Sequence, residues 1–205
     1  MINQVIYAVF LSIIIMMPAI SDDTSVITLR NRLKKINDFY ARFTQKVISA
    51  NNDILLEAYG ELWVKRPNLF NWHMISPEEN FLISDGKTLW FYIPFIKQVT
   101  AYWLQNFSDN IFFMLFSDNN AYKWDNYNVM QQGEFFYLIP IRDNCNLQEF
   151  RVKITDCGTI EQFSVFEKKD QYVDYYLLDQ NNNTIDIKKF YFDVSKDIQL
   201  DEQRE

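Results

Sequence analysis

His73 is the only histidine in the 205-residue chain, so it is the only candidate for an imidazole base. Nucleophilic catalysis needs a serine or cysteine beside such a base, together with an acid that orients the base. The sequence contains no Gly-x-Ser-x-Gly and no Cys-x-x-Cys motif, and it lacks the Cys/His spacings and acidic runs that bind metal ions. We therefore expect a protein that is not an enzyme and that uses no cofactor and no metal ion.

The two cysteines, Cys145 and Cys157, flank a strand that we predict over residues 147–154. An extended strand rises about 3.3 Å per residue, so the separation of the two cysteines is on the order of 35 Å. A disulfide joins Cα atoms only about 6 Å apart. We expect two free thiols, unless a sharp bulge folds the segment back.

A third motif, Asp85-Gly86-Lys87, superficially resembles part of a phosphate-binding loop. Such a loop needs flanking glycines so that its backbone can surround the phosphate, and these are missing here. We interpret residues 84–87 as the turn of a hairpin.

The charge of the chain excludes two classes of partner. Acidic residues outnumber basic ones by 27 to 20, which gives a formal net charge of −7 at pH 7 and a pI of about 4.8. Nucleic acids and anionic membrane surfaces both attract clustered lysines and arginines. We therefore expect no nucleic-acid binding and only weak adsorption to membranes.

The first 21 residues have the pattern of a secretory signal peptide. Residues 5–17 form an apolar run that is too short to span a bilayer comfortably, and the small residues Ala19 and Ser21 place the cleavage before Asp22. The n-region is weakly charged, so an uncleaved anchor remains the alternative. Because position 22 is not a cysteine, the mature chain cannot carry a lipid of its own. We expect residues 22–205 to form one exported domain.

Hydrophobic periodicity predicts few helices and many strands. Residues 22–36 are typical of an amphipathic helix, with one apolar face and another face formed by Arg30, Arg32, Lys34 and Lys35. A second, very apolar helix is expected over residues 107–116. About ten strands are expected, over residues 39–47, 56–64, 70–74, 81–83, 88–92, 127–139, 147–154, 160–168, 172–178 and 189–192.

Strands that follow one another in blocks predict an antiparallel sheet with the helices gathered on one side, an α+β architecture that is mainly β. A curved sheet covered by helices encloses a space. Aromatic residues make up 17% of the chain, and they either fill that space as ordinary core or line it as a cavity. Periodicity leaves both possibilities open.

Several stretches resemble the LolA family of outer-membrane lipoprotein carrier proteins. They are Phe-Thr-Gln at residues 43–45, Arg-Pro-x-x-Phe-x-Trp at residues 66–72, Ser-Asp-Gly-Lys-x-x-Trp at residues 84–90 and Asp-x-Gln-Arg at residues 201–204. The resemblance extends from about Leu29 to the end of the chain. The sequence departs from the family pattern in residues 190–199, which lack the usual prolines, and in its two cysteines.

The resemblance implies an incomplete antiparallel β-barrel, or half-barrel, whose apolar concave face is closed by a lid of helices. The cavity would hold the acyl chains of lipoproteins, carried as cargo through the periplasm of a Gram-negative bacterium by a monomeric chaperone. Two further partners are implied. An inner-membrane ABC-type lipoprotein-releasing complex would load the carrier, and an outer-membrane lipoprotein receptor would unload it.

The resemblance also implies roles for particular residues. Arg66, from the Arg-Pro motif, is expected to hydrogen-bond to the lid and to hold it shut. The acyl-binding cavity is expected to be lined by Leu33, Phe70, Trp72, Leu82, Phe113 and Phe116.

Other classes of protein remain as alternatives. The first is an outer-membrane lipoprotein receptor or another lipid-binding module on a similar half-barrel, against which Asp22 argues because it replaces a lipid-bearing cysteine. A hydrolase of lipids or peptidoglycan lacks its catalytic residues here. A purely structural protein would bind no acyl ligand.

Overall fold

The computed structural model describes residues 22–36, 38–107, 110–116, 123–142, 146–168 and 171–204. Its strands are β1 (Phe39–Ser49), β2 (Ile54–Lys65), β3 (Leu69–Ser76), β4 (Asn80–Asp85), β5 (Thr88–Ile93), β6 (Gln98–Trp103), β7 (Tyr127–Gln132), β8 (Phe135–Pro140), β9 (Leu147–Ile154), β10 (Ile160–Glu167), β11 (Gln171–Asn181) and β12 (Gln199–Glu202). Its α-helices are α1 (Asp22–Leu33) and α2 (Ile111–Phe116), and its 3-10 helices are η1 (Pro94–Ile96), η2 (Leu104–Phe107), η3 (Lys123–Asn126) and η4 (Ile187–Phe190). The predicted signal peptide and Cys145 lie outside the described residues, whereas Cys157 is an exposed free thiol.

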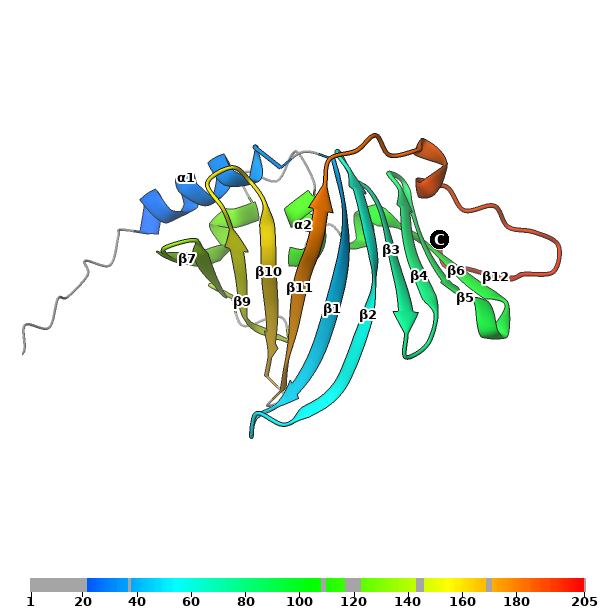
Figure 1. The fold of residues 1–205 in the computed structure, drawn as a ribbon, viewed down its shortest axis with the longest axis horizontal. Coiled ribbons are helices and arrows are strands. Elements are labelled where there is room, and N and C mark those ends of the chain that lie inside the picture. Colours follow the sequence, from blue (N-terminus) through cyan, green and yellow to red (C-terminus); the bar gives the residue numbers. More distant parts are fainter. Residues whose placement is uncertain are drawn as a thin grey trace, which may run out of the picture.

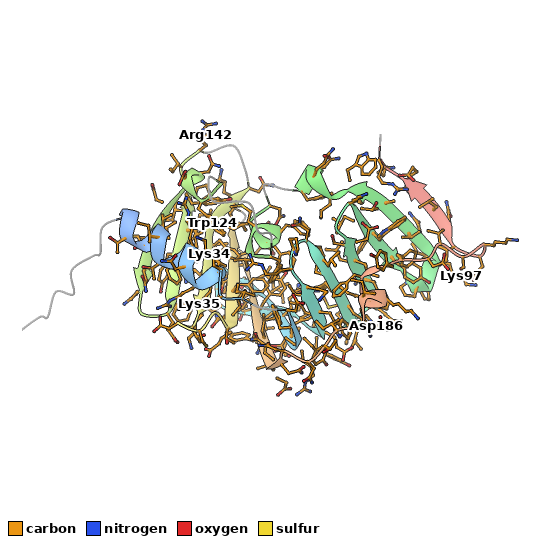
Figure 2. All side chains as sticks on the ribbon, turned by 90° about the horizontal axis from the view of Figure 1, so that it is seen from above. Lys34, Lys35, Lys97, Trp124, Arg142 and Asp186 are labelled. Atoms are coloured by element: carbon orange, nitrogen blue, oxygen red, sulfur yellow. The ribbon has the colours of Figure 1, made fainter. Side chains whose placement is uncertain are left out.

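The strands form one sheet in the order β12-β6-β5-β4-β3-β2-β1-β11-β10-β9-β8-β7. Among the described strands, only β12 and β6 pair in parallel. The sheet ends at β7 on one side and at β12 on the other, so the barrel stays open (Figure 1). Seen from above, Lys34 and Lys35 lie at one end of the sheet and Lys97 at the other (Figure 2). The predicted fold class, a mainly β half-barrel with few helices, is confirmed.

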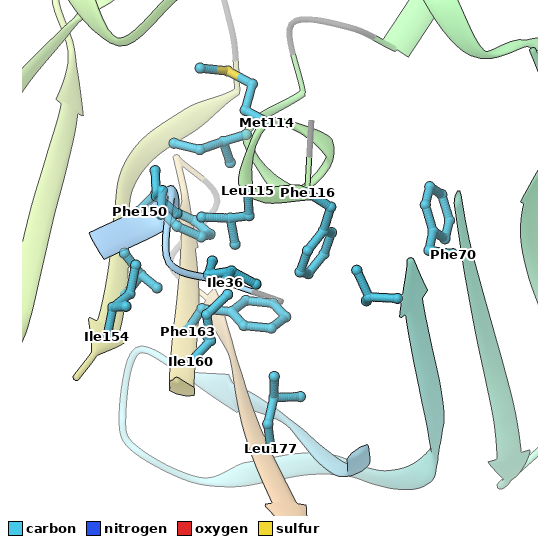
Figure 3. Packing of buried hydrophobic residues seen from close by; sticks show 14 of the residues in the cluster. Ile36, Phe70, Met114, Leu115, Phe116, Phe150, Ile154, Ile160, Phe163 and Leu177 are labelled. Atoms are coloured by element: carbon cyan, nitrogen blue, oxygen red, sulfur yellow. The ribbon is translucent and has the colours of Figure 1, made fainter. Parts of the chain in front are cut away.

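Both α-helices lie over the concave face of the sheet (Figure 1). In β1, the buried side chains of Phe39, Ala41 and Phe43 alternate with more exposed ones, and all three belong to the main apolar cluster that also contains the buried residues of α2. Figure 3 shows Phe116 pointing from α2 into the space between Phe70 and Phe163 of the sheet. The main core therefore lies between the concave face and the helices.

The predicted strand over residues 189–192 is wrong. The segment contains η4, whose first turn is capped by the Asp186 side chain as it accepts a hydrogen bond from the backbone N–H of Lys188. The chain then crosses the other, convex face, where Phe192 lies 5.8 Å from the ring of Trp90, centroid to centroid. The apolar residues of this segment led to the strand prediction, but they cover one face of the sheet and do not pair within it.

Two strands of the sheet, β6 and β12, are not predicted from the periodicity. β12 has only four residues, Gln199–Glu202, and they pair with β6 about 100 positions earlier in the chain. The single strand expected over residues 127–139 is instead a hairpin of β7 and β8. The chain turns there at Gly133, whose φ of +62° favours glycine.

Gly60 of β2 leaves no room for a side chain. A Cβ atom there would lie 2.1 Å from the backbone oxygen of His73 and 2.6 Å from the ring of Phe43. We expect Gly60→Ala to lower the free energy of unfolding by about 1–3 kcal/mol, because the strands must move apart to accept the methyl group. Urea denaturation measures this loss.

Gly133→Asn is the matched control, since nothing lies within 4 Å of a Cβ atom at that turn and asparagine tolerates a positive φ. Equal losses in the two variants would contradict the steric explanation.

Candidate functional site

A cavity of about 570 Å³ lies between the concave face and the start of α2. This volume falls within the range of roughly 300–1,000 Å³ that is common for ligand pockets. Most of the cavity lining is apolar. Several of its apolar side chains were not expected there from the sequence: Met74, Phe91, Ile111, Phe112, Phe163 and Val165. The hollow is therefore suited to an apolar ligand.

Trp72 is the centre of the aromatic part of this wall. Its ring centroid lies 3.9 Å from that of Phe43, 5.3 Å from Phe112 and 5.4 Å from Tyr175. Tyr175 in turn stacks on Phe163 at 4.5 Å. These rings come from β1, β3, β10, β11 and α2, so the wall joins the two halves of the sheet to α2.

The structure divides the residues predicted to line the cavity into two groups. The cavity wall includes Trp72 and Leu82. The packed contact between helices and sheet, beside the cavity, includes Leu33, Phe70, Phe113 and Phe116. In that contact the ring of Phe70 lies 5.3 Å from Phe113 and 6.2 Å from Phe112.

Arg66 connects the end of β2 to the end of α1. Its Nη1 donates hydrogen bonds to the carbonyl oxygens of Leu33, at 2.5 Å, and Ile36, at 3.4 Å. Its backbone N–H donates to Asp38, whose carboxylate also pairs with Lys65 at 2.6 Å. The Leu33 carbonyl also accepts a hydrogen bond from the backbone N–H of Ile36 at 3.2 Å, so the Arg66 guanidinium adds a charged donor to the turn that ends α1.

A second arginine attaches α1 to the other half of the sheet. The buried Arg32 donates from Nη1 to the carbonyl oxygen of Ile154, at 2.6 Å, and forms an ion pair with Asp156. Its guanidinium lies 5.2 Å from the ring centre of Phe136. The basic face of α1 thus contacts β8 and β9, while Lys34 and Lys35 are exposed.

Six residues with polar groups interrupt the apolar lining, namely Gln45, Asn80, Asn110, Tyr127, Glu167 and Tyr175. Burial raises the pKa of Tyr175 to about 12, and the nearby carboxylate of Glu167 adds to this effect. A tyrosine hydroxyl is a donor at neutral pH in any case, and the raised pKa keeps that of Tyr175 protonated to still higher pH.

The described residues contain no group of three or more His, Cys, Asp or Glu side chains that could hold a metal ion. None of the described helices is long and apolar enough to cross a membrane.

Alternation along the strands is the signal by which Met74, Phe163 and Val165 could have been assigned to the concave face. That signal cannot separate cavity lining from filled core, because both kinds of residue face the same way. Phe112 has no such signal, since every residue of α2 is apolar.

Comparisons with known proteins agree with this geometry. The family described as "Outer membrane lipoprotein carrier protein LolA" matches residues 34–193. An outer-membrane lipoprotein carrier protein of Sodalis glossinidius is 45% identical over 203 residues, which cover 99% of each chain. Another from Yersinia pestis is 47% identical over 195 residues, which cover 95% of this chain and 96% of its own. An uncharacterized conserved protein from Thermus thermophilus has a similar fold, with a TM-score of 0.59 at 12% identity, over 88% of this chain and 99% of its own.

Proposed function

The chain belongs to the LolA family of outer-membrane lipoprotein carrier proteins, and we propose that it shelters the acyl chains of lipoproteins while it carries them across the periplasm. The observation that carries this proposal is the apolar cavity between the concave face and α2. An inner-membrane ABC-type complex supplies the cargo, and an outer-membrane receptor takes it over. Residues 84–87 form the turn of the β4–β5 hairpin, and in this proposal energy enters at the loading step, from the inner-membrane complex.

The free energy of acyl burial supports a closing lid. One sixteen-carbon chain, at about 0.8 kcal/mol per CH₂ group, contributes roughly 12 kcal/mol. Three fully buried chains would exceed the practical ceiling of about 18–21 kcal/mol for noncovalent affinity, and such a carrier could not release its cargo. The contact of Phe70 with Phe113 must be given up when cargo displaces the lid, so it competes with the acyl chains and lowers the net affinity.

Arg66 acts in this proposal as the latch of the lid. Its two acceptors, the carbonyls of Leu33 and Ile36, lie at the end of α1 and just after it. These contacts support a closed state that forms when the acyl chains leave. Phe70, Phe113 and Phe116 are the apolar part of the same closure, and Trp72 and Leu82 contact the acyl chains.

The test is to isolate the full-length chain from the periplasm of a Gram-negative host and to analyse what accompanies it. We expect the mature protein to begin at Asp22 and acylated lipoproteins to co-purify with it, both identified by mass spectrometry. Recovery of the protein only in membranes with Met1 retained would contradict export. Recovery of soluble protein without any acylated cargo would contradict the carrier function.

A further inference from the structure

Gln45 and Tyr175 place two hydrogen-bonding side chains next to each other in the apolar wall. They are direct partners on the neighbouring strands β1 and β11. Residues opposite each other in this way have Cβ atoms about 5 Å apart and point to the same face of the sheet. Both residues line the cavity together with Trp72 and Phe163, whose rings contact the ring of Tyr175.

These two groups differ from the other amides of the wall. Asn80 donates to the carbonyl oxygen of Glu78 at 3.0 Å, and the Asn110 side chain accepts from the backbone N–H of Phe112 at 3.0 Å. Within the described part of the chain, neither the Gln45 amide nor the Tyr175 hydroxyl hydrogen-bonds to another residue. A polar group in an apolar wall costs free energy unless something pairs with it.

The chemistry of the two groups indicates which ligand atoms fit. A glutamine amide has two N–H donors, and a tyrosine hydroxyl has one O–H donor. A tyrosine hydroxyl is protonated at neutral pH, and burial strengthens this for Tyr175 by raising its pKa to about 12. Two donors on one apolar wall match carbonyl oxygens at the head of an apolar chain, and every acyl chain begins with a carbonyl group.

We propose that Gln45 and Tyr175 form a carbonyl subsite, in which the Gln45 amide and the Tyr175 hydroxyl donate hydrogen bonds to the ester or amide carbonyls that attach the acyl chains to the cargo. This inference rests on the carrier function proposed above. The hydrocarbon part of a chain is uniform and carries no positional information, whereas the carbonyls are fixed points. The subsite therefore sets how deeply the chains enter, and it selects acylated over merely apolar ligands.

The test compares two probes with purified mature protein. One is a synthetic triacylated lipopeptide, and the other is its analogue with the same alkyl chains joined by ether and amine linkages that contain no carbonyl. We expect the wild type to prefer the acyl probe. Tyr175→Phe and Gln45→Leu should each reduce this preference by about threefold to tenfold, the range of one net hydrogen bond. Affinity for the alkyl probe should change less than twofold.

Gln162 and Tyr176 provide matched controls, since they are direct partners on β10 and β11 one position away and therefore face the opposite side of the sheet. Gln162→Leu and Tyr176→Phe should keep the full preference for the acyl probe. Tyr175→Phe removes a single oxygen and retains the ring that stacks on Phe163, and unchanged binding of the alkyl probe shows that the cavity is intact.

The outcomes separate the subsite from the carrier function. An undiminished acyl preference in both Tyr175→Phe and Gln45→Leu overturns the subsite and leaves the carrier function standing. Equal affinity of the wild type for both probes also overturns the subsite and leaves the carrier function standing. Failure of the wild type to bind either probe overturns the carrier function, and the subsite with it.

Discussion

An Arg66→Leu variant is expected to accept lipoproteins from the inner-membrane complex normally but to pass them to the outer-membrane receptor at least about tenfold more slowly. Arg66 donates to the carbonyl oxygens of Leu33, at the end of α1, and of Ile36, just after it, at 2.5 and 3.4 Å. A hydrogen bond to a charged group contributes about 1.5–3 kcal/mol, and about 1.4 kcal/mol corresponds to a factor of ten. Without this contribution the closed lid competes less with the acyl chains. Reconstituted transfer from carrier to receptor measures the rate.

Two other variants show whether the effect belongs to the latch. Arg66→Lys retains the charge, but an ammonium group lacks the fixed fork of donors, so slow transfer is expected here too. Lys65→Leu removes the neighbouring cation, which pairs with Asp38 and not with α1, and it should transfer at the wild-type rate. If Arg66→Leu unloads as fast as the wild type, Arg66 has no latch function.

Phe70→Glu is expected to reduce the delivery of lipoproteins to the outer membrane at least about tenfold, while the sheet remains folded. The Phe70 side chain is only 2% exposed, and it meets the rings of Phe112 and Phe113 on α2. A carboxylate at this position loses its hydration, at a cost of several kcal/mol. We expect α2 to move away from the sheet, because this movement rehydrates the carboxylate and costs less free energy than unfolding the twelve-stranded sheet. The cavity is then no longer covered by α2.

Delivery of lipoprotein in the reconstituted system and the far-UV circular dichroism of the variant together test this expectation. Phe95→Glu introduces the same change at a side chain that is 95% exposed on the hairpin between β5 and β6, and it should deliver normally. Normal delivery by Phe70→Glu would place residue 70 outside the contact that closes the lid.

Local sequence was sufficient for much of the sheet and for the family. The predicted strand over residues 147–154 coincides with β9, because its apolar side chains alternate and Phe150, Val152 and Ile154 all face the core. The Arg-Pro and Ser-Asp-Gly-Lys segments are contiguous, so they identify the family without any knowledge of how the chain folds. The single histidine and the lack of a Gly-x-Ser-x-Gly or Cys-x-x-Cys motif can likewise be read from the chain alone.

Only the tertiary structure decided what each concave-face residue does. Phe70 and Trp72 lie two positions apart on the same face of β3 and both contact rings of α2, yet Trp72 lines the cavity while Phe70 belongs to the packed contact beside it. The pairing of Gln45 with Tyr175, and of β12 with β6, joins segments about 100 or more positions apart. Periodicity indicates the face on which a side chain lies. A cavity is the volume that two elements leave between them, so it depends on where distant parts of the chain dock.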